Sequence, residues 1–286
     1  MCSVVACDLD GVVWLGRQAI PGAAGGIARL RAHGHRVVFV TNNSYATRAA
    51  CASRLSGIGI PTTPDDIVTS ATAAARWCAG VVPPTARLLV HGGPGVHEAL
   101  RAAGFERLDD AGVPEPDPER HSLRDDSNSD DSRPGEGPHA AVVCGWHPEF
   151  DFERLTRATH ALHLGARFVA TNTDPTYPDQ GRRLPGNGAL VAALERASGR
   201  PPDVVAGKPH SPMVDAVRAI CGSGGIMIGD RPSTDGAFAA ALGWPFALVL
   251  TGVAGRGREE AIPEPAPRWV ESSLGALAER MCEDRS

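Results

Sequence analysis

Short apolar segments alternate with Ala- and Leu-rich helical segments along most of this 286-residue chain, and this alternation limits the fold more than any other feature. The predicted strands are apolar along their whole length, so both faces of their sheet must be buried. The sequence therefore predicts an α/β protein with a Rossmann-like parallel sheet covered by helices on both faces. The strands predicted from this pattern are Ser3–Cys7, Arg36–Val40, Arg87–Val90, Ala140–Val143, Arg167–Ala170, Val204–Val205, Gly225–Ile228 and Phe246–Leu250, with helices between most of them, including Gly22–Ala32 and Thr47–Ser56.

The charge balance excludes several classes of partner. The chain has 28 Lys and Arg residues against 33 Asp and Glu, a net charge of −5, which gives no attraction to nucleic acid or to an anionic membrane. No apolar run approaches the roughly 20 residues that a membrane-spanning helix needs. The seven cysteines are scattered without a C-x-x-C pair. We therefore expect a cytoplasmic protein without a disulfide framework or structural zinc.

Polar and charged side chains lie where the predicted strands end. Ligands of parallel sheets bind beyond the carboxyl ends of the strands, so these side chains are expected to meet at one site. The residues are Asp8 and Asp10, Thr41 and Asn42, Lys208, and Asp230, with Asp235 in a supporting position at a helix start, where the helix dipole favours an acid.

The residue types at these strand ends point to phosphate chemistry. Asp8 and Asp10 suit a magnesium ion, with one carboxylate as a nucleophile and the other as a proton carrier. Thr41 and Asn42 can form a neutral anion cradle, although capping of the following helix explains this stretch as well. Lys208 is the only lysine among 28 basic residues, which favours a task that needs a compact ammonium group.

The stretches DLDGV, VTNNS, GKP and GDRPSTD resemble, in this order, the four motifs of the haloacid dehalogenase (HAD) superfamily of phosphatases. IVTSATAAA, FVATNTDPTYP, LPGNGALVAAL and LVLTGV narrow the resemblance to the para-nitrophenylphosphatase, or NagD-like, branch, and it covers nearly the whole chain. The resemblance implies a HAD fold and a Mg²⁺-dependent phosphomonoester hydrolase that acts on small phosphorylated metabolites.

The resemblance also implies a role for each residue. Asp8 would form an aspartyl-phosphate, and Asp10 would protonate the leaving oxygen and then activate water. Thr41 and Asn42 would hold the phosphoryl group, and Lys208 would bridge it to the nucleophile. The implied magnesium ligands are the Asp8 carboxylate, the Asp10 backbone carbonyl and Asp230.

The spacing of the motifs predicts an inserted domain. About 165 residues separate Thr41 from Lys208, several times the roughly 30 of one βαβ unit. We expect a catalytic core at residues 1–82 and 186–286 and an α/β cap at 83–185, with residues 109–138 a disordered acidic insertion. The resemblance implies that the cap closes over the site and allows a homodimer formed through it.

Two features leave the substrate open. The family usually has an acid in the cap where this chain has Trp146 and His147, and Asn172 and Asp174 either contact substrate or stabilise a turn. Glycerol phosphate, phosphoglycolate, pyridoxal phosphate, nucleotides and sugar phosphates all occur in this branch. Similarity of the TNTDPTYP…LPGNG stretch to actinobacterial relatives favours glycerol phosphate or a similar small ester.

Two other functions compete with the phosphatase hypothesis. A non-catalytic regulator could keep the HAD fold to bind a metabolite, but binding alone does not need Asp10. A dinucleotide-binding oxidoreductase could use the glycines of LLVHGGPGVHEAL (88–100), although these lack the full G-x-G-x-x-G spacing.

Overall fold

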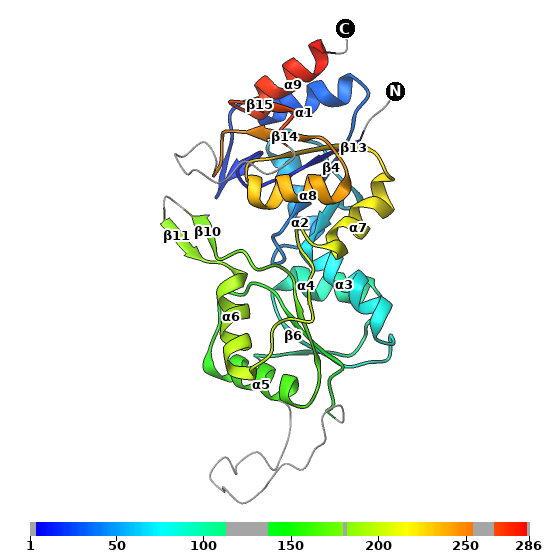
Figure 1. The fold of residues 1–286 in the computed structure, drawn as a ribbon, viewed down its shortest axis with the longest axis vertical. Helices are drawn as coiled ribbons and strands as arrows, with labels where there is room; N and C mark the ends of the chain where they lie inside the picture. The colour runs from blue at the N-terminus through cyan, green and yellow to red at the C-terminus, as the bar shows by residue number, and fades with distance from the viewer. Residues whose placement is uncertain (1–3, 113–136, 180–181, 254–265, 285–286) are drawn as a thin grey trace, which may run out of the picture.

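The computed structural model describes residues 4–112, 137–179, 182–253 and 266–284, and in these ranges the chain forms two parallel sheets (Figure 1). One sheet has the strand order β15-β14-β13-β1-β4-β5, and the other has the order β12-β9-β8-β6-β7. Two short antiparallel ladders, β2-β3 and β10-β11, complete the strand pairing of the described ranges. The predicted α/β fold with parallel sheets is confirmed.

The helices and strands have the following bounds. The strands are β1 (Val4–Cys7), β2 (Trp14–Leu15), β3 (Gln18–Ala19), β4 (Arg36–Thr41), β5 (Ile67–Thr69), β6 (Leu88–His91), β7 (Leu108–Asp110), β8 (Ala141–Cys144), β9 (Arg167–Ala170), β10 (Thr176–Asp179), β11 (Arg182–Pro185), β12 (Val204–Val205), β13 (Gly225–Gly229), β14 (Phe246–Val249) and β15 (Trp269–Glu271). The helices are α1 (Ala23–Ala32), α2 (Arg48–Gly57), α3 (Ser70–Val81), α4 (Pro94–Ala102), α5 (Phe152–His163), α6 (Asn187–Ser198), α7 (Ser211–Cys221), α8 (Ala237–Leu242) and α9 (Leu274–Glu283), with short helical turns at Pro64–Asp66 and Pro232–Gly236.

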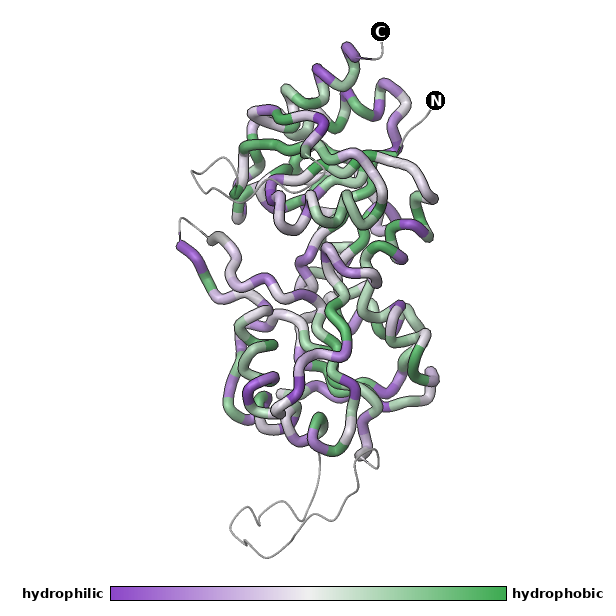
Figure 2. The backbone as a smooth tube through the Cα atoms, in the orientation of Figure 1, coloured by the Kyte–Doolittle hydropathy of each residue, from purple (hydrophilic) through white to green (hydrophobic). Residues whose placement is uncertain are grey.

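The six-stranded sheet is buried on both faces, as its apolar strands require. Successive residues of β1 point to opposite faces, so Val5 and Cys7 pack into one hydrophobic cluster and Ala6 into another. The first cluster includes apolar residues of α1, α2 and α9, and the second includes those of α3, α7 and α8. In Figure 2, hydrophobic residues are concentrated in the interior of this part of the chain. β1 therefore lies between two helical layers, and its carboxyl end is held rigidly.

The five-stranded sheet is built in the same way and forms the cap. Leu89 of β6 packs into a cluster with α5 and α6, while its neighbours Leu88 and Val90 face the cluster that contains α4. In the view of Figure 1 this sheet and its helices lie below the six-stranded sheet. One face of the cap sheet thus has a hydrophobic cluster of its own, and the other face shares a cluster with α3, α7 and α8 of the core.

The return from the cap to the core comes later than the boundary expected at residue 186. β12 pairs in parallel with β9, with Val204 opposite Val169, and therefore belongs to the cap sheet. Leu190 and Leu194 of α6 pack into the cap cluster as well. The expected boundary is corrected to the loop that follows Val205. Alternation of strands and helices alone cannot show which sheet a two-residue strand joins.

Part of the expected acidic insertion is ordered strand. Asp109 and Asp110 belong to β7, which pairs with β6, so the expectation of disorder from residue 109 is wrong. Each carboxylate has an arginine partner: Asp109 lies 2.9 Å from Arg87, and Asp110 lies 2.9 Å from Arg154. The greater part of the insertion, residues 113–136, lies outside the described residues.

The glycine-rich segment after β6 packs the cap against the domain that contains the six-stranded sheet. A Cβ added at Gly93 would collide with the Tyr45 ring, and one at Gly95 would collide with the Ala46 carbonyl. These glycines are therefore needed for close packing against the β4–α2 loop, and the space beside them is not free for a dinucleotide pyrophosphate. In the described parts of the chain, no helix is both long and apolar enough to cross a membrane.

Candidate active site

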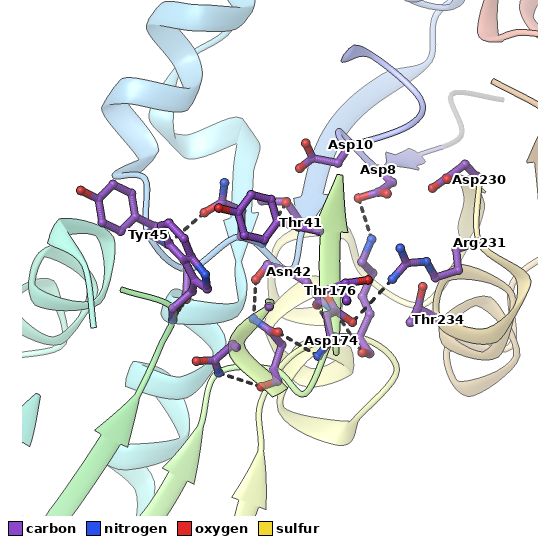
Figure 3. A pocket seen from close by; sticks show the side chains of 18 residues that line it. Asp8, Asp10, Thr41, Asn42, Tyr45, Asp174, Thr176, Asp230, Arg231 and Thr234 are labelled. Atoms are coloured by element: carbon purple, nitrogen blue, oxygen red, sulfur yellow. Dashed lines mark hydrogen bonds and ion pairs between the residues drawn. The ribbon is translucent and has the colours of Figure 1, made fainter. Parts of the chain in front are cut away.

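Three of the candidate residues lie at adjacent strand ends of the six-stranded sheet. β1 pairs with β13 on one side and with β4 on the other, so Asp8, Asp230 and Thr41 follow or end neighbouring parallel strands. All three are buried. Figure 3 shows the Asp8 and Asp230 carboxylates facing the same small region. The local sequence explains this, because apolar runs of similar length place the first polar residue of each strand at the same edge.

Lys208 reaches this region from the segment that follows the last strand of the cap sheet. Its Nζ lies 2.7 Å from Asp8 Oδ1 and 2.6 Å from Asp235 Oδ1, and the residue is 5% exposed. Lys208 follows β12 and so comes from a strand of the other sheet, not from the edge where we expected it. Burial alone would lower the pKa of Lys208, but Asp235 and Asp8 together raise it above its ordinary value. The lysine is therefore charged and shared by two acids.

Asp235 connects the lysine to the backbone of the neighbouring loop. Its Oδ2 accepts hydrogen bonds from the backbone N–H groups of Asp230, at 3.2 Å, and Arg231, at 3.1 Å. Its Oδ1 accepts from Lys208. Both oxygens of Asp235 thus have partners within the protein, and the residue orients the lysine and the Asp230 loop.

The three buried acids outnumber the one lysine between them. Ligand oxygens of Asp8, Asp230 and Asp235 all lie within 4.8 Å of one another. Burial raises the pKa of Asp8 well above its usual range, although Lys208 acts in the opposite direction. Burial and the nearby Asp235 raise the pKa of Asp230 to about 7. Such crowding of carboxylates favours a further cation, and hard oxygen donors are what Mg²⁺ prefers.

Asp10 lies apart from this cluster and is exposed to the pocket. Its Oδ1 accepts a hydrogen bond of 3.0 Å from Trp14 Nε1. Desolvation by the surrounding protein raises the pKa of its carboxyl, while the bond from Trp14 lowers it. Figure 3 shows the side chain on the same side of the pocket as Asp8, without contact between the two.

Asn42 has a different set of contacts from those expected. Its Oδ1 accepts from the Lys208 backbone N–H at 2.8 Å, and its Nδ2 donates to the Lys208 carbonyl at 3.3 Å and to Asp174 Oδ2 at 3.1 Å. The amide is occupied by protein partners, so its side chain holds the lysine loop and the cap together. Both Asn42 and Thr41 line the pocket, and Thr41 Oγ1 accepts from the Asn43 backbone N–H at 3.1 Å.

The pocket in front of these residues has a volume of about 210 Å³ and is walled by both domains. Tyr45, Trp146 and Tyr177 meet edge to face, with ring centroids 5.3 and 5.2 Å apart. Asn172 donates to the Asn42 carbonyl at 2.8 Å, and Asp174 lies 3.8 Å from Arg231. The turn explanation is confirmed, because the Asp174 backbone N–H donates to Asn172 Oδ1 at 3.1 Å. Both residues also line the pocket and connect the cap to the core.

Arg231, Tyr45 and Tyr177 line the pocket but were not among the residues expected there. Arg231 lines the pocket beside Asp230, and its pKa is raised by Asp174 and the other acids against the effect of burial. The signal for Arg231 was its position directly after a candidate metal ligand at a strand end. Tyr45 and Tyr177 carried no such signal, since their common wall exists only when the cap lies against the core.

The chain is similar to hydrolase families and to curated phosphatases. Residues 5–106 match the family described as haloacid dehalogenase-like hydrolase, and residues 205–277 match a family described as HAD-hydrolase-like. D-glycerol 3-phosphate phosphatase of Mycobacterium tuberculosis is 37% identical over 247 residues, 86% of this chain and 62% of that protein. Glycerol-3-phosphate phosphatase of Gallus gallus is 36% identical over 267 residues, 89% of this chain and 82% of that protein.

A solved structure agrees with these matches. Glycerol phosphate phosphatase from M. tuberculosis in complex with magnesium superposes with a TM-score of 0.79 and 34% identity, over 96% of this chain and 76% of that one.

The chain belongs to the haloacid dehalogenase-like hydrolases.

The acid cluster has the carboxylate donors that a metal-dependent HAD hydrolase needs to bind its metal ion. Only one ammonium group lies among the three buried carboxylates, in contact with Asp8 and Asp235. The pKa values of Asp8 and Asp230 are raised, and a bound divalent cation would relieve this. Asp235 has no oxygen to spare, because its contacts to Lys208 and to two backbone N–H groups use both. The donor set of this HAD hydrolase therefore suits Mg²⁺ at Asp8 and Asp230.

Proposed function

We propose that this chain is a Mg²⁺-dependent phosphomonoesterase that acts on small phosphorylated metabolites through an aspartyl-phosphate at Asp8. The contact of Lys208 Nζ with Asp8 Oδ1 at 2.7 Å carries the proposal. It places a fixed positive charge beside a buried carboxylate that lines the pocket, which is what attack on a phosphate dianion requires.

The proposed mechanism assigns one task to each side chain. Asp8 attacks the phosphorus atom, and Asp10 gives its proton to the leaving oxygen as the P–O bond breaks. Asp10, now a carboxylate, takes a proton from the water that hydrolyses the aspartyl-phosphate. Lys208 and the Thr41 hydroxyl hold phosphoryl oxygens throughout, and the Asn42 side chain keeps the Lys208 loop in place.

Magnesium would be held by the Asp8 carboxylate, the Asp10 backbone carbonyl and Asp230. When bound it neutralises phosphate oxygens and brings the reacting groups into line. Asp235 supports this arrangement from behind, through Lys208 and the Asp230 backbone N–H.

We favour glycerol phosphate or a similarly small ester as the substrate. The pocket of about 210 Å³ is smaller than the roughly 300–1,000 Å³ of sites for drug-sized ligands. The names of the two relatives above agree with this choice. We also place the protein in the cytoplasm, since the seven cysteines are scattered along the chain without a C-x-x-C pair. A homodimer through the cap stays part of the proposal.

A phosphate-release screen tests the proposal. Purified protein is incubated with glycerol 3-phosphate, phosphoglycolate, pyridoxal phosphate, nucleoside monophosphates and sugar phosphates, with Mg²⁺ and with EDTA. We expect Mg²⁺-dependent release that is fastest for a small ester. Release from none of them would contradict the proposal and favour a metabolite-binding regulator.

Replacement of the nucleophile tests the mechanism. Asp8→Asn removes the attacking oxygen at nearly constant volume, so phosphate release should fall below detection while the far-ultraviolet circular dichroism spectrum stays unchanged. Release at the wild-type rate would refute the assignment of Asp8.

A further inference from the structure

We propose that Trp14 is a positioning residue for Asp10: its indole N–H holds one oxygen of the carboxyl group, so that the other oxygen meets the leaving group. This inference rests on the proposed function, in which Asp10 is the general acid. It concerns a residue outside the motifs that the sequence analysis selected.

The contact that carries the inference joins two residues on one tight turn. Trp14 Nε1 donates to Asp10 Oδ1 at 3.0 Å, and Trp14 is only 3% exposed although it ends in a polar N–H group. The backbone closes the same turn, because Gly11 N–H donates to the Trp14 carbonyl at 2.7 Å and Trp14 N–H donates to the Leu9 carbonyl at 3.2 Å. The indole and the acid therefore form one rigid unit.

An arginine contacts the face of the Trp14 indole ring. The guanidinium of Arg54, on α2, lies 3.9 Å from the centroid of the Trp14 ring and donates to the Gly16 carbonyl. Cation–π contact and a hydrogen bond to the next turn together hold the ring in one orientation. The direction of its N–H group is thus set by α2 and not by solvent.

The geometry decides which oxygen of Asp10 carries the proton. A carboxyl oxygen that accepts a hydrogen bond from an N–H donor is the carbonyl-like oxygen of the acid, so the proton lies on the other one. In Asp10 that is Oδ2, because Trp14 occupies Oδ1. As the P–O bond breaks, this proton passes from Oδ2 to the leaving oxygen, the product leaves as a neutral alcohol, and Asp10 becomes a carboxylate.

The test compares leaving groups. An alkoxide is a strong base and must be protonated as it leaves, whereas 4-nitrophenolate is a weak base and leaves without a proton. We therefore measure kcat/KM, which reports on phosphoryl transfer to Asp8, for glycerol 3-phosphate and for 4-nitrophenyl phosphate with wild type and Trp14→Phe. The phenyl ring keeps an aromatic surface for Arg54 and removes the N–H donor, together with the pyrrole part of the indole; the aryl ester controls for the lost packing.

We expect Trp14→Phe to lower kcat/KM about tenfold or more for the alkyl ester and less than threefold for the aryl ester. Equal losses for the two esters, or no loss for either, would overturn the inference. The double variant with Asp10→Asn should lose no more alkyl activity than Asp10→Asn alone, because Trp14 acts through Asp10. Independent, multiplying losses would also overturn it.

The chain contains a matched control at the far edge of the sheet. Trp269 Nε1 donates to Asp284 Oδ2 at 3.0 Å, and the Arg268 guanidinium lies 4.4 Å from the Trp269 ring centroid. Trp269→Phe therefore removes a Trp–Asp hydrogen bond of the same kind, beside an arginine stacked on the indole, at a place away from the pocket. Its ratio of alkyl to aryl kcat/KM should equal that of wild type.

Two further outcomes separate the inference from the proposed function. If wild type releases phosphate from neither ester, the proposed function fails and the comparison with Trp14→Phe does not arise. If Trp14→Phe does not fold, as judged by thermal melting, Arg54→Met replaces it, because Arg54 is exposed and the indole stays. That variant should lower the alkyl-to-aryl ratio two- to fivefold, and an unchanged ratio would overturn the inference.

Discussion

Lys208 shows at the residue scale why a chain with 27 arginines keeps one lysine. Its Nζ lies between two carboxylate oxygens at 2.7 and 2.6 Å, and the side chain is almost fully enclosed. A single nitrogen with three hydrogens fits this position, whereas a planar guanidinium presents two nitrogens in a fixed fork. The sequence count therefore pointed to a steric requirement of the site.

Lys208→Arg should be poorly tolerated for this reason. We expect kcat to fall by about 100-fold or more, as for loss of a charge-stabilising donor in other enzymes. Steady-state kinetics with the best ester of the screen measures it. Arg36→Lys is the control for general Arg–Lys exchange, because Arg36 is exposed and bonds only to the Ile220 carbonyl in the described contacts. Full activity of Lys208→Arg would contradict the steric explanation.

The sequence identified the charged residues of the site but not all of their contacts. Asp8, Thr41 and Asp230 were predictable together because each ends an apolar strand of one parallel sheet. The amide of Asn42 was expected to face phosphate, yet it holds the Lys208 backbone. No local pattern distinguishes these uses of an amide, since the partner lies 166 residues away along the chain.

At the scale of elements, the loop between β1 and β2 needs a glycine beside the acid cluster. Gly11 has φ +89°, and a Cβ there would lie 2.5 Å from Asp230 Cγ. The left-handed backbone and the close approach of a carboxylate both exclude a side chain. The DLDG stretch is thus as much a packing requirement as a chemical one.

Gly11→Ala should weaken Mg²⁺ binding at least tenfold, because the methyl group displaces the Asp230 carboxylate. Isothermal titration with Mg²⁺ measures the affinity directly. Gly34→Ala is the matched control: it has a similar φ of +82° but no atom within 4 Å of the added Cβ. It should lose some stability from backbone strain and keep wild-type Mg²⁺ affinity. Equal affinities for the two variants would contradict the steric argument.

Elements were predictable where an apolar run is long enough to be buried on both faces. Each strand and helix named from the sequence lies within one residue of its observed bounds where these are described. The hairpin β10-β11 was missed because it contains Thr, Pro and Arg instead of an apolar run. The pairing of β12 with β9 was also not predicted, because a two-residue strand carries no local signal for the sheet that it joins.

On the scale of the whole molecule, stability should depend on pH through the acid cluster. Asp230 has a pKa of about 7 in the folded protein, above the roughly 3.9 of an unfolded aspartate. Between these values the folded state holds a proton that the unfolded state has released. The free energy of unfolding of the metal-free protein should therefore fall as pH rises from about 4 to 7. The raised pKa of Asp8 acts in the same direction.

Magnesium should reverse this trend, because it binds the ionised carboxylates and only the folded state presents them together. We expect Mg²⁺ to raise the melting temperature more at pH 8 than at pH 5, as measured by thermal denaturation with and without EDTA. Asp230→Asn should abolish most of the difference. A Mg²⁺ effect of equal size at both pH values would contradict the assignment of the cluster as the metal site.

The pairing of β12 with β9 has a consequence for recombining this protein with its relatives. Only Ala206 and Gly207 separate the last residue of the cap sheet from Lys208. A chimera that exchanges caps by cutting at residue 186 would leave the donor sheet without its edge strand. Cutting after Val205 at the carboxyl-terminal of the two junctions would transplant a complete sheet while retaining the acceptor's own GKP turn, so the cap could be exchanged without disturbing Lys208.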